Sequence, residues 1–286
     1  MTEKNKISEF ITFPKTFDTY KWYKPIIIFI IAAILTIILQ LAVSLIFTIV
    51  FGGDVIDPIL NGGYESLNTP LGEIITDLSV IIMIPALYVA NKIVKYVQSS
   101  AFISSRGGWN FKLYFKALVV PFILYIIYEV ISFFVNGPQG TPNFSVGFFI
   151  LTLILVPLQC ISEEYVFRGF VMPTFGSWFK IPILAIILQS VLFTVIHGYN
   201  AIGLISIFVS GVIFGILAWK TNGIEVSSAL HTVNNLMMSF TVMFGLDLAT
   251  STIKIDDFVI SIVFNIIVFA IVYYVGNRTN WYGELE

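Results

Sequence analysis

Three short motifs place side chains that could do acid–base chemistry inside strongly apolar stretches of this sequence. They are Glu163-Glu164-Tyr-Val-Phe-Arg168, Phe193-Thr-Val-Ile-His197 and His231-Thr-Val-Asn-Asn235. The chain has only two histidines, and both belong to these motifs. Ionisable groups in an apolar span cost at least a few kcal/mol each, so those that occur there are usually functional or tightly paired.

The first motif predicts one paired carboxylate and one free carboxylate. On a helix, Glu164 and Arg168 are four residues apart with the acid first, which is the favourable order for an ion pair. Glu163 points about 100° away from Glu164, so it is not the natural partner of the arginine. The structural alternative is that all three side chains form a charge cluster at the inner membrane interface.

The two histidine motifs have structural interpretations as well. His197 could hydrogen-bond a neighbouring helix, and His231 and Asn235, which share one helix face, could make a polar contact between helices. Together with Glu163, however, these are the groups that peptide hydrolysis requires. A carboxylate or imidazole takes a proton from water, and hydrogen-bond donors stabilise the oxyanion of the tetrahedral intermediate.

A zinc site is the alternative use of the same residues. Glu163, His197 and His231 would make a ligand set of two histidines and one glutamate, with an open position for water. The spacing does not follow the His-Glu-x-x-His pattern of zinc-binding helices. We therefore expect no metal or other cofactor, and keep zinc as the alternative.

The elements that must position these residues are membrane helices. The composition is 57% hydrophobic and 11% charged with a mean hydropathy of +0.92, whereas soluble domains carry about a quarter charged residues. With 15 basic and 17 acidic residues there is no basic excess, which excludes a nucleic-acid partner. The single cysteine, Cys160, excludes an internal disulfide framework.

Eight apolar segments have about the length that a helix needs to cross a bilayer. They are Ile26–Phe51, Ile74–Val94, Ala117–Val135, Val146–Ile161, Ile181–Ile196, Ala201–Trp219, Ile224–Phe240 and Phe258–Val275. The prediction is an all-α, polytopic membrane protein of about eight transmembrane helices. A tail of residues 1–24 precedes a single membrane domain of residues 25–286, and the three motifs lie within residues 146–240.

Basic residues predict the orientation, because Lys and Arg are retained on the cytoplasmic side. With both termini cytoplasmic, every Lys and Arg except Lys254 falls on the inner side, Arg168 included. The use of Ile, Lys and Asn is typical of bacteria, which indicates a bacterial plasma membrane.

Simple spans put Glu163 and His197 at opposite ends of their helices, too far apart to share a water. We therefore expect the helix of Glu163 to continue to about Phe175 and the helix of His197 to continue to about Ala201. Glu163 and His197 should then lie roughly 3–6 Å apart. Asp77 is interpreted as a solvated boundary charge, and Gly211 and Gly215 as a site of close helix packing.

The three motifs, in this order on successive apolar helices, resemble the CAAX-protease and bacteriocin-processing family of intramembrane endopeptidases. The resemblance covers about residues 146–240 and implies a catalytic cavity within the membrane. It implies that Glu163 and His197 activate water, and that His231 and Asn235 form the oxyanion site. Glu164, Arg168 and Phe193 would support them.

The function that follows is an intramembrane endopeptidase acting on a membrane-associated protein or peptide. Family members with immunity roles keep open a non-catalytic immunity or regulatory protein of the same fold. A zinc-dependent protease is the other alternative. An ion-coupled transporter is disfavoured, because no half-sequence repeat is found.

Overall fold

The computed structural model describes residues 9–61 and 69–279. Residues 1–8 of the predicted tail and residues 280–286 lie outside the described residues, as do residues 62–68. Over the described ranges the chain forms helices and connections, and its only β-type pairing is an isolated bridge between Ser104 and Gly223. The predicted all-α fold is confirmed.

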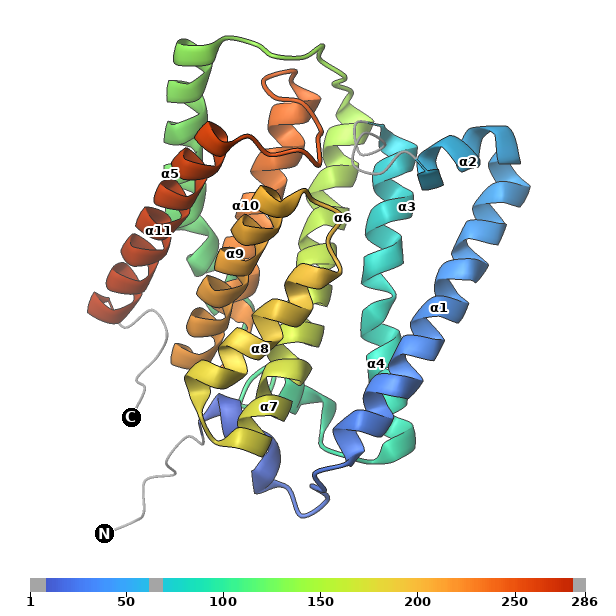
Figure 1. Cartoon of the computed structure of the whole chain (residues 1–286), viewed down its shortest axis with the longest axis vertical. Helices are drawn as coiled ribbons and strands as arrows, with labels where there is room; N and C mark the ends of the chain where they lie inside the picture. Colours follow the sequence, from blue (N-terminus) through green and yellow to red (C-terminus); the bar gives the residue numbers. More distant parts are fainter. Residues whose placement is uncertain (1–8, 62–68, 280–286) are drawn as a thin grey trace.

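Figure 1 shows the helices running up and down as one bundle. In chain order they are η1 (Phe10–Thr16), α1 (Lys24–Phe51), α2 (Gly53–Asn61), α3 (Pro70–Ile81), α4 (Met83–Val94), η3 (Ser99–Phe102), α5 (Phe111–Asn136), α6 (Val146–Glu164), η4 (Tyr165–Val171), α7 (Met172–Phe179), α8 (Pro182–Val195), α9 (Ala201–Lys220), α10 (Glu225–Met243) and α11 (Ile255–Arg278).

Six helices of the described chain are long and apolar enough to cross a membrane. They are α1, the pair α3–α4, α5, the continuous run from α6 to α7, α9 and α11. The two other predicted spans are also helical, but α8 is short and α10 is not among the six. The protein is therefore a multi-pass membrane protein.

The polar helix α10 is enclosed by the rest of the bundle. It packs against α5, α6 and α9, and most of its side chains are buried. In α1, by contrast, only Pro25 and Ile28 are buried, and the remaining apolar side chains are half-buried or exposed. Polar side chains are tolerated at membrane depth where protein surrounds them. The enclosure of α10 explains why a helix with His231 and Asn235 can lie at the centre of the bundle.

The helix of Glu163 continues well beyond the predicted span, as expected. The run from α6 through η4 to α7 ends at Phe179, so Glu163 lies near its middle. Segment η4 is π-helical. Such insertions into α-helices are frequent at functional sites, because the extra residue per turn re-aims the neighbouring side chains.

The expected extension of the His197 helix is wrong. Helix α8 ends at Val195, and His197 lies in the turn before α9, with its N–H bonded to the Thr194 carbonyl. Asn200 caps the start of α9 by accepting a hydrogen bond from Gly203 N–H at 2.9 Å. Because Asn200 caps α9, α8 cannot continue to Ala201.

The prediction of close packing at Gly211 and Gly215 is confirmed. A Cβ added at Gly211 would lie 3.1 Å from Ser190, and one added at Gly215 would lie 2.9 Å from the Gln189 amide nitrogen. Both contacts are made by α8, so the two glycines allow α8 and α9 to approach closely.

Candidate active site

The two glutamates of the first motif lie at the end of α6, immediately before the π-helical turn. Glu164 and Arg168 are fully buried and Glu163 is 6% exposed. Arg168, counted among the basic residues of the inner side, lies within the helical run from α6 to α7 with its guanidinium inside the bundle, and not on a connection.

The predicted ion pair between Glu164 and Arg168 is confirmed. Arg168 Nη1 lies 3.0 Å from Glu164 Oε1, and the guanidinium is 4.2 Å from the ring centre of Phe193 and 5.2 Å from that of Phe214. Arg168 Nη2 also donates to the Gly211 carbonyl at 3.3 Å. The two aromatic faces and the carboxylate partner compensate the guanidinium for the hydration that it loses on burial.

His231 reaches from α10 to both glutamates. Its Nδ1 lies 3.1 Å from Glu164 Oε1, and its Nε2 lies 3.5 Å from Glu163 Oε2. The ring of Phe214 stacks on the imidazole at 4.7 Å between centres. A carboxylate paired with arginine can only accept hydrogen bonds, so Nδ1 of His231 donates to Glu164 and Nε2 faces Glu163.

Asn235 completes this group from one turn further along α10. Its Nδ2 lies 3.4 Å from His231 Nε2 and 3.3 Å from Gln159 Oε1 on α6. The structure thus brings together Glu163, Glu164, His231 and Asn235, which come from two helices separated by more than sixty positions in the sequence.

His197 is the predicted site residue that the structure does not place in direct contact with this group. Its Nδ1 bonds the Phe193 carbonyl at 2.7 Å, and no acidic side chain in the described ranges forms an ion pair with it. The Phe193 ring contacts both imidazoles, with centres 4.7 Å from His197 and 6.1 Å from His231. That one water joins Glu163 and His197 stays a prediction.

Four residues of the site were not identified from the sequence as site residues. Gln159 lies one helical turn before Glu163, and this spacing was the available signal. Asn234 precedes Asn235 and donates to its Oδ1 at 2.9 Å. Tyr125 and Phe214 belong to α5 and α9, and no local pattern relates them to the three motifs.

The interpretation of Asp77 as a solvated boundary charge is wrong. Asp77 and its α3 neighbour Glu73 are both buried, on a helix that packs against α6. Ser162, next to Glu163, donates to the Val80 carbonyl of α3 at 2.8 Å and holds the two helices together. The packing of α3 against α6 thus buries Asp77, although its place near the start of an apolar segment suggested the membrane boundary.

The side chains do not fit the zinc alternative as they are placed. Among the described residues, no three His, Cys, Asp or Glu side chains converge as a metal site. Glu164 is engaged by Arg168, and His197 is directed to a backbone carbonyl. A three-ligand zinc site would need His197 to turn towards Glu163 and His231.

Residues 143–237 match the family described as type II CAAX prenyl endopeptidase Rce1-like. This segment is similar to that family. It contains all three motifs, so the resemblance inferred from them is confirmed. The site described above lies entirely within the match, except for Tyr125 on α5.

The chain is also similar to the uncharacterized protein YyaK of Bacillus subtilis (strain 168), with 26% identity over 186 residues. The similarity covers 60% of this chain and 62% of YyaK, so it spans less than two thirds of that relative. No solved structure matches the chain.

Proposed function

We propose that this protein is an intramembrane endopeptidase that hydrolyses a peptide bond of a membrane-associated protein or peptide. The observation that carries the proposal is the buried group of Glu163, His231 and Asn235, in which a carboxylate, an imidazole and an amide meet within a helical bundle. The Rce1-like match over the same residues supports a protease.

In the proposed reaction, Glu163 accepts a proton from a water molecule as the water oxygen attacks the carbonyl carbon of the substrate. The new C–O bond leaves a negative charge on the former carbonyl oxygen. Glu163 then passes its proton to the amide nitrogen, the C–N bond breaks, and a carboxylic acid and an amine leave. The proposal assigns His197, whose ring contacts Phe193, to the same water.

The negative oxygen of the intermediate is stabilised by donors from α10. Asn235 Nδ2 and His231 Nε2 are 3.4 Å apart, and both can donate to one oxygen bound beside them once the imidazole takes up a proton on Nε2 in the reaction. Each such donor is worth about 3 kcal/mol of the activation barrier. The Glu164–Arg168 pair holds Nδ1 of His231, so the imidazole keeps its orientation.

The proposed mechanism needs no metal. Chelators should leave turnover unchanged, and the purified protein should contain no stoichiometric zinc by elemental analysis. Loss of activity on chelation, restored by added zinc, would support the zinc-dependent alternative instead.

The test of the proposal is proteolysis by the purified protein in lipid vesicles. The probes are a set of apolar synthetic peptides and a farnesylated CAAX peptide, with products identified by mass spectrometry. Glu163→Gln keeps the size and hydrogen bonding of the side chain but removes the base, so turnover should fall by about 100-fold or more. Glu129→Gln, at a half-buried glutamate of α5 outside the motifs, is the matched control and should keep full turnover.

Native substrates are sought by comparing peptide termini in membranes of cells that express the wild type or Glu163→Gln. New termini should depend on Glu163. If wild-type and Glu163→Gln cells show identical termini and both variants protect cells equally in a bacteriocin-immunity assay, the protein is a non-catalytic immunity factor and the proposal fails.

A further inference from the structure

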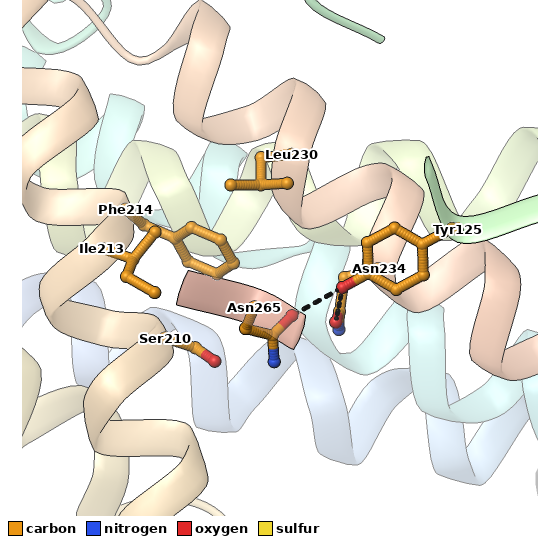
Figure 2. A pocket seen from close by; sticks show the side chains of 7 residues that line it. All are labelled: Tyr125, Ser210, Ile213, Phe214, Leu230, Asn234 and Asn265. Atoms are coloured by element: carbon orange, nitrogen blue, oxygen red, sulfur yellow. Dashed lines mark hydrogen bonds between the residues drawn. The ribbon is translucent and has the colours of Figure 1, made fainter. Parts of the chain in front are cut away.

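A hydrogen-bonded row of side chains extends from the site towards α5 and α11. Tyr125 of α5 is buried, and its hydroxyl lies 2.6 Å from Asn234 Oδ1 and 2.8 Å from Asn265 Oδ1. Figure 2 shows the phenol and the two amides meeting at one point, with Asn234 on α10 and Asn265 on α11. Asn234 is the direct neighbour of Asn235, and the row therefore reaches the site.

The donors and acceptors of this row are ordered in one direction, because the Tyr125 phenol has a single proton to donate. The shorter contact, to Asn234 Oδ1, takes that proton. Asn265 then satisfies the phenol oxygen best by turning its own NH2 group towards it. A cavity of about 10 Å³ lies beside Asn265 and Asn234. It has about the volume of one water and gives the remaining amide atoms room for a partner.

The same direction continues into the site. With its oxygen engaged by Tyr125, Asn234 presents its NH2 group to Asn235 Oδ1 at 2.9 Å. Asn235 therefore keeps its oxygen on the side of Asn234 and its NH2 group on the side of His231 and Gln159. The reverse orientation would put a carbonyl oxygen beside His231 Nε2 and remove the donor from the proposed oxyanion site.

We propose that Tyr125 is a positioning residue that acts through Asn234 to keep the NH2 group of Asn235, rather than its carbonyl oxygen, beside His231 Nε2. The role rests on the proposed endopeptidase function as far as turnover is concerned, whereas the orientation of the amide does not depend on the function. Tyr125 lies outside the Rce1-like match, and its hydroxyl bonds the third motif at Asn234.

The chain offers a matched control for Tyr125. Tyr128 lies on the same helix, and the two phenol rings both pack on Phe264, with centres 4.8 Å and 4.4 Å from it. Tyr125→Phe and Tyr128→Phe therefore remove the same atom from two neighbouring rings. Only the first removal takes away the proton that orients Asn234.

The first measurement does not require activity. The protein has two histidines, so ¹⁵N-histidine labelling gives two imidazole spin systems. In Tyr125→Phe the Asn235 amide can turn, and the Nε2 resonance of His231 should shift while that of His197 stays in place. Neither resonance should shift in Tyr128→Phe. In an Asn235→Ala background, Tyr125→Phe should no longer move the His231 resonance, because no amide remains to turn.

The second measurement is a double-mutant cycle on turnover of whichever peptide probe the wild type cleaves. Tyr125→Phe should lower kcat by about tenfold with KM unchanged, since part of the oxyanion donor is lost. In the Asn235→Ala background the same change should have no effect on kcat, because coupled residues are not additive. A purely structural role of Tyr125 would instead lower kcat equally in both backgrounds.

Asn234→Asp is the second variant, in case Tyr125→Phe does not fold. An aspartate accepts from Tyr125 but has no NH2 group for Asn235, so the amide should reverse and kcat should fall at least as far. An unchanged His231 resonance in folded Tyr125→Phe and Asn234→Asp, or additive effects with Asn235→Ala, would overturn the proposal. A wild type that cleaves nothing would count against the proposed function alone, since the resonance test would still decide the orientation of the amide.

Discussion

At the scale of single residues, Glu163 and Glu164 are adjacent in sequence but differ in their partners. Glu164 is fully buried against Arg168 and His231, whereas the one ion-pair partner of Glu163 among the described residues is His231, at 3.5 Å. Since removing one member of a buried ion pair leaves an uncompensated charge, the two positions should respond differently to the same substitution.

Glu164→Gln should lower the free energy of unfolding by about 3–5 kcal/mol, because it leaves the Arg168 guanidinium without its partner in a low-dielectric environment. Thermal unfolding in detergent measures the loss. The matched variant Glu163→Gln should unfold close to the wild-type temperature. The double variant Glu164→Gln with Arg168→Met should recover part of the loss, and equal destabilisation by the two glutamine variants would contradict the assignment of the pair.

His197 and His231 also differ at this scale. His231 lies between two carboxylates, whereas His197 Nδ1 bonds the backbone carbonyl of Phe193. His231→Ala should reduce kcat by about 100-fold or more, as loss of an oxyanion donor does. Single-turnover cleavage of the peptide probe measures this. If His197→Ala alone abolishes cleavage while His231→Ala is tolerated, the roles of the two imidazoles are reversed.

At the scale of elements, the π-helical segment η4 is held against the connection that precedes α5. A Cβ added at Gly169 would lie 2.1 Å from the Phe102 carbonyl oxygen, and such an approach is not possible without moving one of the two segments. Because Gly169 has no side chain, η4 can lie this close to Phe102. The position of η4 in turn sets the direction of the Arg168 side chain.

Gly169→Ala should destabilise the protein by about 1–3 kcal/mol through this clash, as overpacking does. It should also lower turnover, because the displaced segment includes Arg168. Gly147→Ala in α6 is the control, since an added Cβ there meets no atom within 4 Å. The control should match or slightly exceed wild-type stability by thermal unfolding, and equal losses in both variants would contradict the packing argument.

At the scale of the whole molecule, the connections divide into two sets at opposite ends of the bundle. Figure 1 shows the start of α1 and the ends of α4, α7 and α9 at one end, and α2 with the α5–α6 and α10–α11 connections at the other. Lys24, Lys95, Lys180 and Lys220 mark the first set. The segregation of basic residues agrees with the expected cytoplasmic side.

Reporter fusions test this orientation. A fusion after Ser105 should report a cytoplasmic location, and one after Gln139, in the connection between α5 and α6, should report an external location. Alkaline phosphatase and fluorescent-protein reporters at each position serve as reciprocal controls. A cytoplasmic signal at Gln139 would overturn both the orientation and the number of crossings before α6.

The sequence determined what depends on local spacing and on composition. The apolar lengths specify membrane helices, and the four-residue interval specifies the Glu164–Arg168 pair, because both follow from the rise and period of a single helix. The order of the three motifs was sufficient to indicate the Rce1-like resemblance. The requirement that Glu163 and His197 share one water predicted that the helix of Glu163 continues to about Phe175, and the helical run ends at Phe179.

The tertiary structure decided what depends on the packing of one helix against another. It placed His231 between the two glutamates and left His197 in the turn after α8, bonded to the Phe193 carbonyl, because α8 stops at Val195. It buried Asp77, and it joined Tyr125 to Asn235 through Asn234. Contacts between residues far apart in the sequence follow from the register of packed helices, and no local spacing in the sequence encodes that register.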